Sequence, residues 1–292
     1  MVFDVHTHAP RHRTAPPVDE THMNALWRPD QTATVAVTWD DYLAAMEEIE
    51  RSIVFNIAAD PRQPFVDDGG LIYPTPRVND DTAAFVHAYP DKLIGFMSVH
   101  PFDPGVLDEI ERCTQDLGLR GIKLGPNYQN FDPVGEEAFR VYRRAEELGL
   151  PILFHQGTSP VQFADLDFAH PRHIDRVAMA FPNLKMILAH MGHPWQVDCF
   201  VVIRKHPNVY ADISANFYRP WSYYNALRLA TEWNVLHKLL FGSDYPIVTP
   251  RETLDALFHV NDILEGTKLP RVPEAELEKI PRRNSLELLG LA

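Results

Sequence analysis

Short apolar runs alternate along this chain with longer segments whose apolar residues recur at helical spacing. Several runs, such as Ile152–His155 and Met186–His190, are apolar at nearly every position, which is typical of strands buried on both faces. On this pattern we expect eight strands, namely Phe3–His6, Ile53–Ile57, Leu93–Val99, Arg120–Leu124, Ile152–His155, Met186–His190, Val209–Ile213 and Leu239–Gly242.

Between these runs the spacing of apolar residues predicts helices. Trp39–Glu50 has acidic residues in its first turn, and Glu136–Leu148 is followed by Gly149, a residue that commonly ends a helix. The other expected helices are Val106–Leu117, His173–Phe181, Pro194–Lys205, Ser222–Trp233, Thr253–Leu264 and a terminal one in Pro281–Leu291. Repeated strand–helix units predict a parallel sheet. Eight strands in 292 residues predict a closed (β/α)8 TIM barrel, with residues 1–292 as a single domain.

Two long segments interrupt the alternation of strands and helices. Ala9–Thr38 follows the first expected strand and Ala58–Pro76 follows the second, and both are rich in proline and polar residues. Loops that follow the strands of such a barrel leave its C-terminal end, where the active sites of this architecture lie. The two segments either cover a site there or are plain surface loops.

Composition narrows the class of partner. Hydrophobic residues make up 45% and charged residues 23%, as in ordinary soluble globular proteins, and the net charge is −13. An acidic chain argues against nucleic acid or an anionic membrane and leaves a small-molecule substrate as the expected partner. No apolar run approaches the ~20 residues that span a bilayer. With two cysteines and no leader before the first strand, we expect a cytoplasmic protein.

The first strand ends in two histidines separated by one residue, in Asp4-Val5-His6-Thr7-His8. Side chains at positions i and i+2 of a strand point to the same side, so His6 and His8 converge at the end of the barrel. Two buried imidazoles without a counter-charge or a metal would be costly to bury. We therefore expect metal ligation, and the alternative is a pair of structural histidines.

Three other expected strands end at a similar polar residue. His155 follows the apolar run Pro151–Phe154, His190 follows Met186–Ala189, and Asp244 comes shortly after Leu239–Gly242. Because the C-terminal ends of barrel strands meet around one axis, these side chains are expected to approach His6 and His8.

At this point the sequence resembles the amidohydrolase superfamily. It looks most like the single-metal branch that contains aminocarboxymuconate-semialdehyde decarboxylase and other amidohydrolase-related proteins. The motifs that carry the resemblance span nearly the whole chain in the order of the family, and they are DVHTH, GIKLGP, LPILFHQG, LKMILAHMG, LLFGSDYP and RRNSLELLGL.

The resemblance implies roles for the residues at these strand ends. His6, His8, His155 and Asp244 match metal ligands, Asp244 also matches the group that handles a proton, and His190 matches a residue beside the water or substrate. Three imidazoles and one carboxylate suit Zn²⁺ with an open coordination position, although Mn²⁺ and Fe²⁺ are compatible with the same set.

Lys123, at the end of the fourth expected strand, has more than one interpretation. In the binuclear relatives a lysine here is carboxylated and bridges two metals, with residues matching His155 and His190 on the second ion. In the single-metal branch the lysine is unmodified. We expect one metal, with Lys123 in a structural role or in contact with a substrate anion. The alternative is a carboxylated Lys123 that bridges two metals.

Four further residues follow strands at the same end of the barrel and are candidates for substrate binding. Arg219 is suited to a bidentate pair with a substrate carboxylate, unless it is an ordinary surface arginine. The other three are Tyr218, Asn127 and Trp195.

Taken together, these features predict a metal-dependent hydrolase. Its expected substrate is a small, cyclic or aromatic ester, lactone or amide of a carboxylic acid, attacked by a water that the metal activates. The alternative is a metal-dependent, non-oxidative decarboxylase of an aromatic or muconate-like acid. A third hypothesis is a barrel that has lost activity and binds a ligand. The resemblance also suggests a homodimer.

Overall fold

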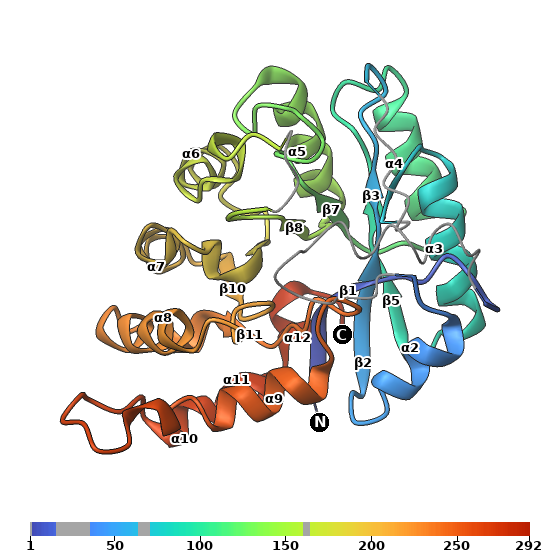
Figure 1. The fold of residues 1–292 in the computed structure, drawn as a ribbon. Helices are drawn as coiled ribbons and strands as arrows, with labels where there is room; N and C mark the ends of the chain where they lie inside the picture. Colours follow the sequence, from blue (N-terminus) through green and yellow to red (C-terminus); the bar gives the residue numbers. More distant parts are fainter. Residues whose placement is uncertain (1, 16–35, 64–70, 160–163) are drawn as a thin grey trace.

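A computed structural model describes residues 2–15, 36–63, 71–159 and 164–292, and it shows a ring of strands surrounded by helices (Figure 1). The strands are β1 (Phe3–His8), β2 (Arg51–Phe55), β5 (Leu93–Gly95), β6 (Met97–Ser98), β7 (Ile122–Leu124), β8 (Ile152–Phe154), β9 (Met186–Leu188), β10 (Val209–Asp212) and β11 (Leu239–Leu240). β5 and β6 flank Phe96 and act as one barrel strand, so the strands match the expected series.

The ring of parallel strands is closed. Pairing runs β1–β2–β5 and β6–β7–β8–β9–β10–β11. The amide of Val5 donates to the carbonyl of Phe241 at 3.0 Å, which joins the last strand to the first. The predicted (β/α)8 barrel is therefore confirmed.

Eight helices follow the barrel strands within the described residues. They are α2 (Trp39–Ala45), α3 (Arg77–Ala88), α4 (Val106–Gln115), α5 (Glu136–Leu148), α6 (Arg172–Ala180), α7 (Gln196–Lys205), α8 (Pro220–Glu232) and α9 (Pro250–Phe258). α3 has no counterpart among the expected helices. The helix expected over Thr253–Leu264 is α9 followed by a separate 3-10 turn, η4 (Asp262–Leu264). None of the helices described here has the length and apolar character needed to cross a bilayer.

Two short strands follow β2 in the next part of the chain. β3 (Ile57–Ala58) continues beyond β2 and pairs in parallel with β4 (Ile72–Tyr73). The predicted loop after the second strand includes residues 64–70, which lie outside the described residues, as do residues 16–35 of the predicted loop Ala9–Thr38.

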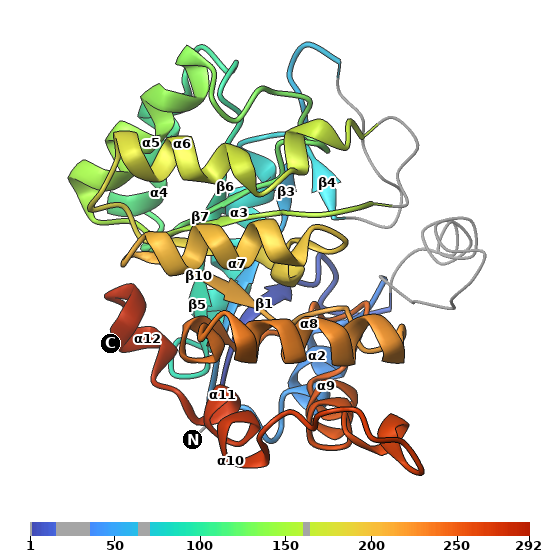
Figure 2. The ribbon, with the colours of Figure 1, turned by 90° about the vertical axis from the view of Figure 1, so that its left-hand side faces the viewer.

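The inside of the barrel is a packed core that reaches to the C-terminal helix. The core includes Phe55, Phe96, Leu153 and other buried strand residues, together with Leu286, Leu289 and Leu291. Leu286 and Leu289 belong to α12 (Ser285–Leu289), and Leu291 follows this helix. Two short helices, α10 (Glu274–Leu277) and α11 (Lys279–Arg282), precede it. Both termini lie at the same end of the barrel (Figure 2). α12 therefore covers the N-terminal end of the barrel, whereas the polar residues lie at the C-terminal ends of the strands.

Removing a core side chain of α12 should test this covering role. Leu289 is fully buried, so we expect Leu289→Ala to lower the free energy of unfolding by about 2–5 kcal/mol. The measurement is urea denaturation, with Leu288→Ala as a control, because Leu288 is only partly buried on the same helix. Equal losses in the two variants would contradict the role of α12 as a cover of the core.

Candidate metal centre and active site

A cavity opens at the C-terminal ends of the strands. All six residues to which the sequence analysis gave a metal or catalytic role contribute to its lining, and they are His6, His8, Lys123, His155, His190 and Asp244. These residues come from five different strand ends, so the structure brings together what the sequence pattern predicted would meet.

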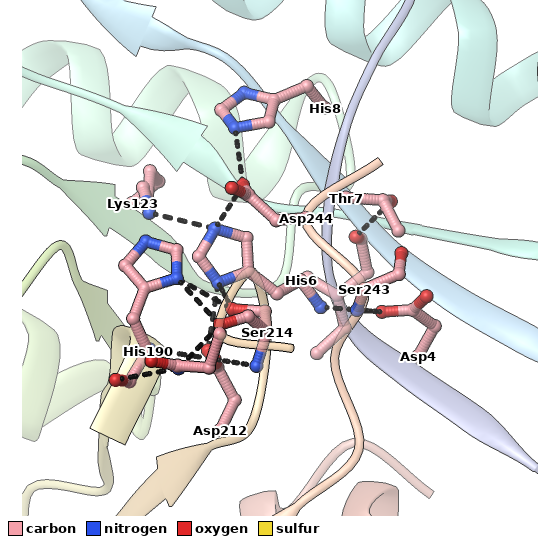
Figure 3. A network of polar contacts seen from close by, with 12 residues as sticks. Asp4, His6, Thr7, His8, Lys123, His190, Asp212, Ser214, Ser243 and Asp244 are labelled. Atoms are coloured by element: carbon pink, nitrogen blue, oxygen red, sulfur yellow. Dashed lines mark hydrogen bonds and ion pairs between the residues drawn. The ribbon is translucent and has the colours of Figure 1, made fainter. Parts of the chain in front are cut away.

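His6, His8 and Asp244 form the most compact group in this cavity. One carboxylate oxygen of Asp244, Oδ1, lies 3.2 Å from Nε2 of His6 and 3.3 Å from Nε2 of His8 (Figure 3). Candidate ligand atoms of the three residues all lie within 4.8 Å of one another. Two imidazole nitrogens and a carboxylate oxygen in one place form a donor set suited to a divalent transition metal.

The backbone around this group is arranged to bring β1 and β11 close together. The amide of Asp244 donates to the carbonyl of His6 at 2.8 Å, and Asp244 has a left-handed backbone with φ of 70°. A Cβ atom at Gly242 would lie only 2.9 Å from the Cβ atom of His6, so glycine is required there. Asp4 accepts hydrogen bonds from the amides of His6 and Ser243 at 3.1 and 3.0 Å, which joins the two strands again.

Burial and neighbouring charges oppose each other in this group. Burial by itself raises the pKa of Asp244, but the adjacent His6 and His8 outweigh it and hold the pKa of this carboxyl well below its usual range. Burial also disfavours a charged His6, yet Asp212 and Asp244 raise the pKa of that ring. At Lys123, burial dominates and lowers the pKa of the amine to about 8.

His155 offers a ring nitrogen that the protein itself does not use. Its Nε2 atom is buried and has no hydrogen-bond partner among the described residues. The ring lies against His190 and Tyr128, with ring centroids 5.1 and 4.5 Å away. A buried nitrogen without such a partner fits a metal ligand, but ligation by His155 stays a prediction, because His155 does not belong to the compact group of His6, His8 and Asp244.

His190 lies in the short turn η2 (Ala189–Gly192), with a left-handed backbone of φ 59°. Its amide donates to Asp212 Oδ1 at 2.9 Å, and its Nδ1 atom lies 2.8 Å from the hydroxyl of Ser214. Strained non-glycine residues concentrate at functional sites, and here the strain is held by these hydrogen bonds.

Asp212 and Ser214 were not among the residues expected from the sequence. Asp212 ends the apolar strand β10, which is the same signal that identified His155 and His190. It is fully buried, and its other oxygen, Oδ2, lies 2.8 Å from Nδ1 of His6.

Lys123 points into the cavity beside His6. Its amine lies 3.5 Å from Nε2 of His6 and 4.6 Å from the centre of the Phe55 ring. The side chain is 1% exposed, so a cationic amine there is held almost without water.

Of the four residues predicted to bind substrate, one contributes to the cavity lining and three do not. Tyr218 is the one that lines the cavity. Arg219 is exposed and stacks on the Tyr218 ring at 4.5 Å, and Trp195 is half-buried and packs against His170. Asn127 is fully buried, and neither polar atom of its side chain has a partner among the described residues. Arg219, Trp195 and Asn127 do not contribute to the cavity lining.

Apolar residues that the sequence analysis did not single out form much of the remaining wall, and they are Ile57, Leu71, Ile72, Ala215 and Ile247. Ile57 and Ile72 belong to β3 and β4, whose pairing joins residues on either side of a long loop. No local pattern marked these residues, because their place in the wall depends on that pairing.

Comparisons with known proteins agree with this architecture. The family model described as Amidohydrolase matches residues 3–291. Among curated proteins, a dihydroorotase of Helicobacter pylori (strain G27) is 30% identical over 125 residues. These residues make up 40% of this chain and 35% of that protein, so the match spans about a third of its length.

Solved structures resemble the whole chain at low sequence identity. An uncharacterized TIM-barrel protein from Bordetella bronchiseptica has a TM-score of 0.72 at 21% identity, covering 99% of this chain and 98% of that one. A probable 2-pyrone-4,6-dicarboxylic acid hydrolase from Acinetobacter baumannii, with citric acid bound, has 0.63 at 18%, covering 99% of each chain. A dihydroxybenzoic acid decarboxylase from Polaromonas sp. JS666, with bound manganese and the inhibitor 2-nitroresorcinol, has 0.62 at 20%, covering 98% and 97%.

Proposed function

Since the chain belongs to the amidohydrolase family, we propose that it is a metal-dependent hydrolase of a small cyclic or aromatic ester, lactone or amide of a carboxylic acid. The observation that carries the proposal is the position of Asp244. Its carboxylate is in contact with both histidines of β1 and faces the cavity, where a reacting water and substrate would meet.

The residues present fit a single divalent metal, which we propose to be Zn²⁺ or, with the same ligands, Mn²⁺ or Fe²⁺. His6, His8 and Asp244, whose candidate ligand atoms lie together, would hold it. We propose His155 as a further ligand because its buried Nε2 atom has no partner among the described residues. When bound, such a metal polarises a substrate carbonyl and lowers the pKa of water toward ~7.

The reaction then needs the side chains to transfer a proton and to orient the attacking water. Asp244 accepts the proton of the attacking water while the new carbon–oxygen bond forms, and it delivers that proton to the leaving oxygen or nitrogen as the old bond breaks. His190 lines the same cavity, and because its Nδ1 atom faces the hydroxyl and the carbonyl of Ser214, its Nε2 atom is placed to accept a hydrogen bond from the attacking water and to orient it.

The rest of the cavity favours a compact substrate with an apolar body. Three isoleucines, Ile57, Ile72 and Ile247, and the ring of Tyr128 line this cavity together with the polar residues. Lys123, deep in the same cavity, is placed to pair with one anionic group of the substrate.

The second candidate is a non-oxidative decarboxylase of an aromatic or muconate-like acid. It is favoured by the combination of apolar walls with a buried lysine, which suits an aromatic ring bearing a carboxylate. In this reaction a ring carbon takes a proton and the carbon–carbon bond to the carboxylate breaks to release CO₂. The group beside the ring must then begin the cycle protonated, whereas Asp244 is held in its ionised form.

A product assay distinguishes the two reactions. Protein reconstituted with Zn²⁺ or Mn²⁺ is incubated with two sets of compounds, one of lactones and cyclic amides including dihydroorotate, the other of hydroxybenzoates. Hydrolysis releases a new carboxylic acid, seen as base uptake in a pH-stat, without CO₂. Release of CO₂ from a hydroxybenzoate, with no ring opening in the first set, would reject the hydrolase proposal.

A further inference from the structure

We propose that Asp212 is a positioning residue that sets the proton arrangement of both His6 and His190. Through His6 it would control metal binding, and through Ser214 it would orient the proton of His190. This inference rests on the proposed function, because it takes His6 as a metal ligand and His190 as a group that faces the substrate. In this proposal Asp212 itself touches neither the substrate nor the metal.

The carboxylate of Asp212 is fully buried, and both of its oxygens are engaged. Oδ2 accepts from Nδ1 of His6 at 2.8 Å. Oδ1 accepts from the amides of His190 and Ser214 at 2.9 and 3.0 Å, and also from the hydroxyl of Ser214 (Figure 3). One side chain on β10 thus connects β1 with the turn that follows β9.

The contacts of His6 favour one tautomer of its ring. Both ring nitrogens face a carboxylate oxygen, but Nδ1 lies closer, 2.8 Å from Asp212, than Nε2, 3.2 Å from Asp244. The amine of Lys123, which can only donate, lies 3.5 Å from Nε2, so the proton of the neutral ring is placed on Nδ1 and the lone pair on Nε2. Metal ligands in proteins are commonly oriented in this way, by a carboxylate on the ring nitrogen that does not bind the metal.

The same carboxylate acts on His190 through the hydroxyl of Ser214. That hydroxyl has one proton, which it donates to Asp212, so its oxygen must accept from Nδ1 of His190 at 2.8 Å. The carbonyl of Ser214, which also can only accept, lies 3.3 Å from the same nitrogen. Two acceptors at Nδ1 leave the lone pair of a neutral His190 on Nε2.

His6, His190 and Asp212 are also close enough to be considered as a metal site, since their candidate ligand atoms lie within 4.8 Å of one another. However, the carboxylate already accepts four hydrogen bonds, and Nδ1 of both rings already has an acceptor. The described contacts therefore favour a supporting layer behind the metal ligands over a second ion.

The substitution Asp212→Asn separates the effect of Asp212 on His6 from its effect on His190. The amide oxygen can keep the three donors at Oδ1, which fixes the amide nitrogen opposite His6. That nitrogen donates to Nδ1 of His6 and forces the ring proton onto Nε2, where it blocks metal binding. The arrangement at Ser214 and His190 is unchanged in this variant. Ser214→Ala does the reverse, because it removes the hydroxyl contact of His190 and leaves the carboxylate on His6.

The experiment combines two measurements on metal-free protein. Nitrogen-15 NMR of histidine-labelled protein at alkaline pH, where the rings are neutral, reports the tautomer of each ring. Competition with a chromophoric chelator reports the affinity for Zn²⁺. Asp175→Asn is the matched control, because Asp175 also pairs with a histidine, His206 at 2.7 Å, but lies outside the cavity.

We expect His6 and His190 of the wild type to carry their protons on Nδ1. Asp212→Asn should move the proton of His6 alone and weaken Zn²⁺ affinity by roughly 10–100-fold, while Asp175→Asn leaves affinity unchanged. A wild-type ring protonated on Nε2, or unchanged affinity in Asp212→Asn, would overturn the inference. If the wild type binds none of Zn²⁺, Mn²⁺ and Fe²⁺, the proposed function fails. The tautomers in the wild-type spectrum still decide the inference in that case, and also if Asp212→Asn does not fold.

Discussion

Asp244→Asn is expected to lower turnover by roughly 10²–10⁴-fold while the protein stays folded. Asparagine has nearly the same shape and tolerates the left-handed backbone found at this residue, where φ is 70°. It cannot accept the proton of the attacking water, so the step assigned to Asp244 is lost even if a metal is still bound.

The measurement is kcat on a substrate identified by the product assay, together with metal content and the thermal melt of the same preparation. Asp198→Asn is the control, since Asp198 pairs with Arg172 away from the cavity and should leave kcat unchanged. A folded, metal-loaded Asp244→Asn protein that turns over at the wild-type rate would remove Asp244 from the mechanism.

Metal binding should also make a large contribution to stability. At a free metal concentration 100 to 1,000 times the dissociation constant, a ligand that binds only the folded state stabilises it by about 3–4 kcal/mol. We expect this increment in the wild type and a much smaller one in His155→Ala. Because Nε2 of His155 has no hydrogen-bond partner in the described part of the chain, the substitution removes none of the hydrogen bonds described there.

Denaturation with and without added Zn²⁺ measures the increment. His100→Ala is the matched control, because His100 is also buried but lies outside the cavity lining, with its ring at the carbonyl of Gln129. That variant should lose stability equally with and without metal and keep the increment. A full metal increment in His155→Ala would show that His155 is not a ligand.

The same preparations give the number of metal ions per chain. We expect one ion, and the same number in Lys123→Ala, if the lysine contacts substrate. Two ions, falling to one or none in Lys123→Ala, would instead identify Lys123 as a carboxylated bridge between two metals.

The sequence by itself determined the barrel and the main cluster of polar residues. Apolar runs of strand length mark β1, β8 and β9 without reference to the rest of the chain. The alternation of strands with helices then requires a parallel sheet, in which the C-terminal ends of the strands meet. For that reason His6, His8, His155, His190 and Asp244 could be expected in one cavity, although Asp244 follows His6 by 238 positions in the sequence.

Only the tertiary structure decided which other side chains reach this cluster. Asp212 and His6 are 206 positions apart, and their 2.8 Å contact depends on how β10 and β1 are placed around the closed barrel. Arg219 follows β10 as expected, yet its side chain turns onto Tyr218 at the surface. Such contacts depend on the register of strands and the direction of individual side chains, and a one-dimensional pattern of apolar and polar residues contains neither.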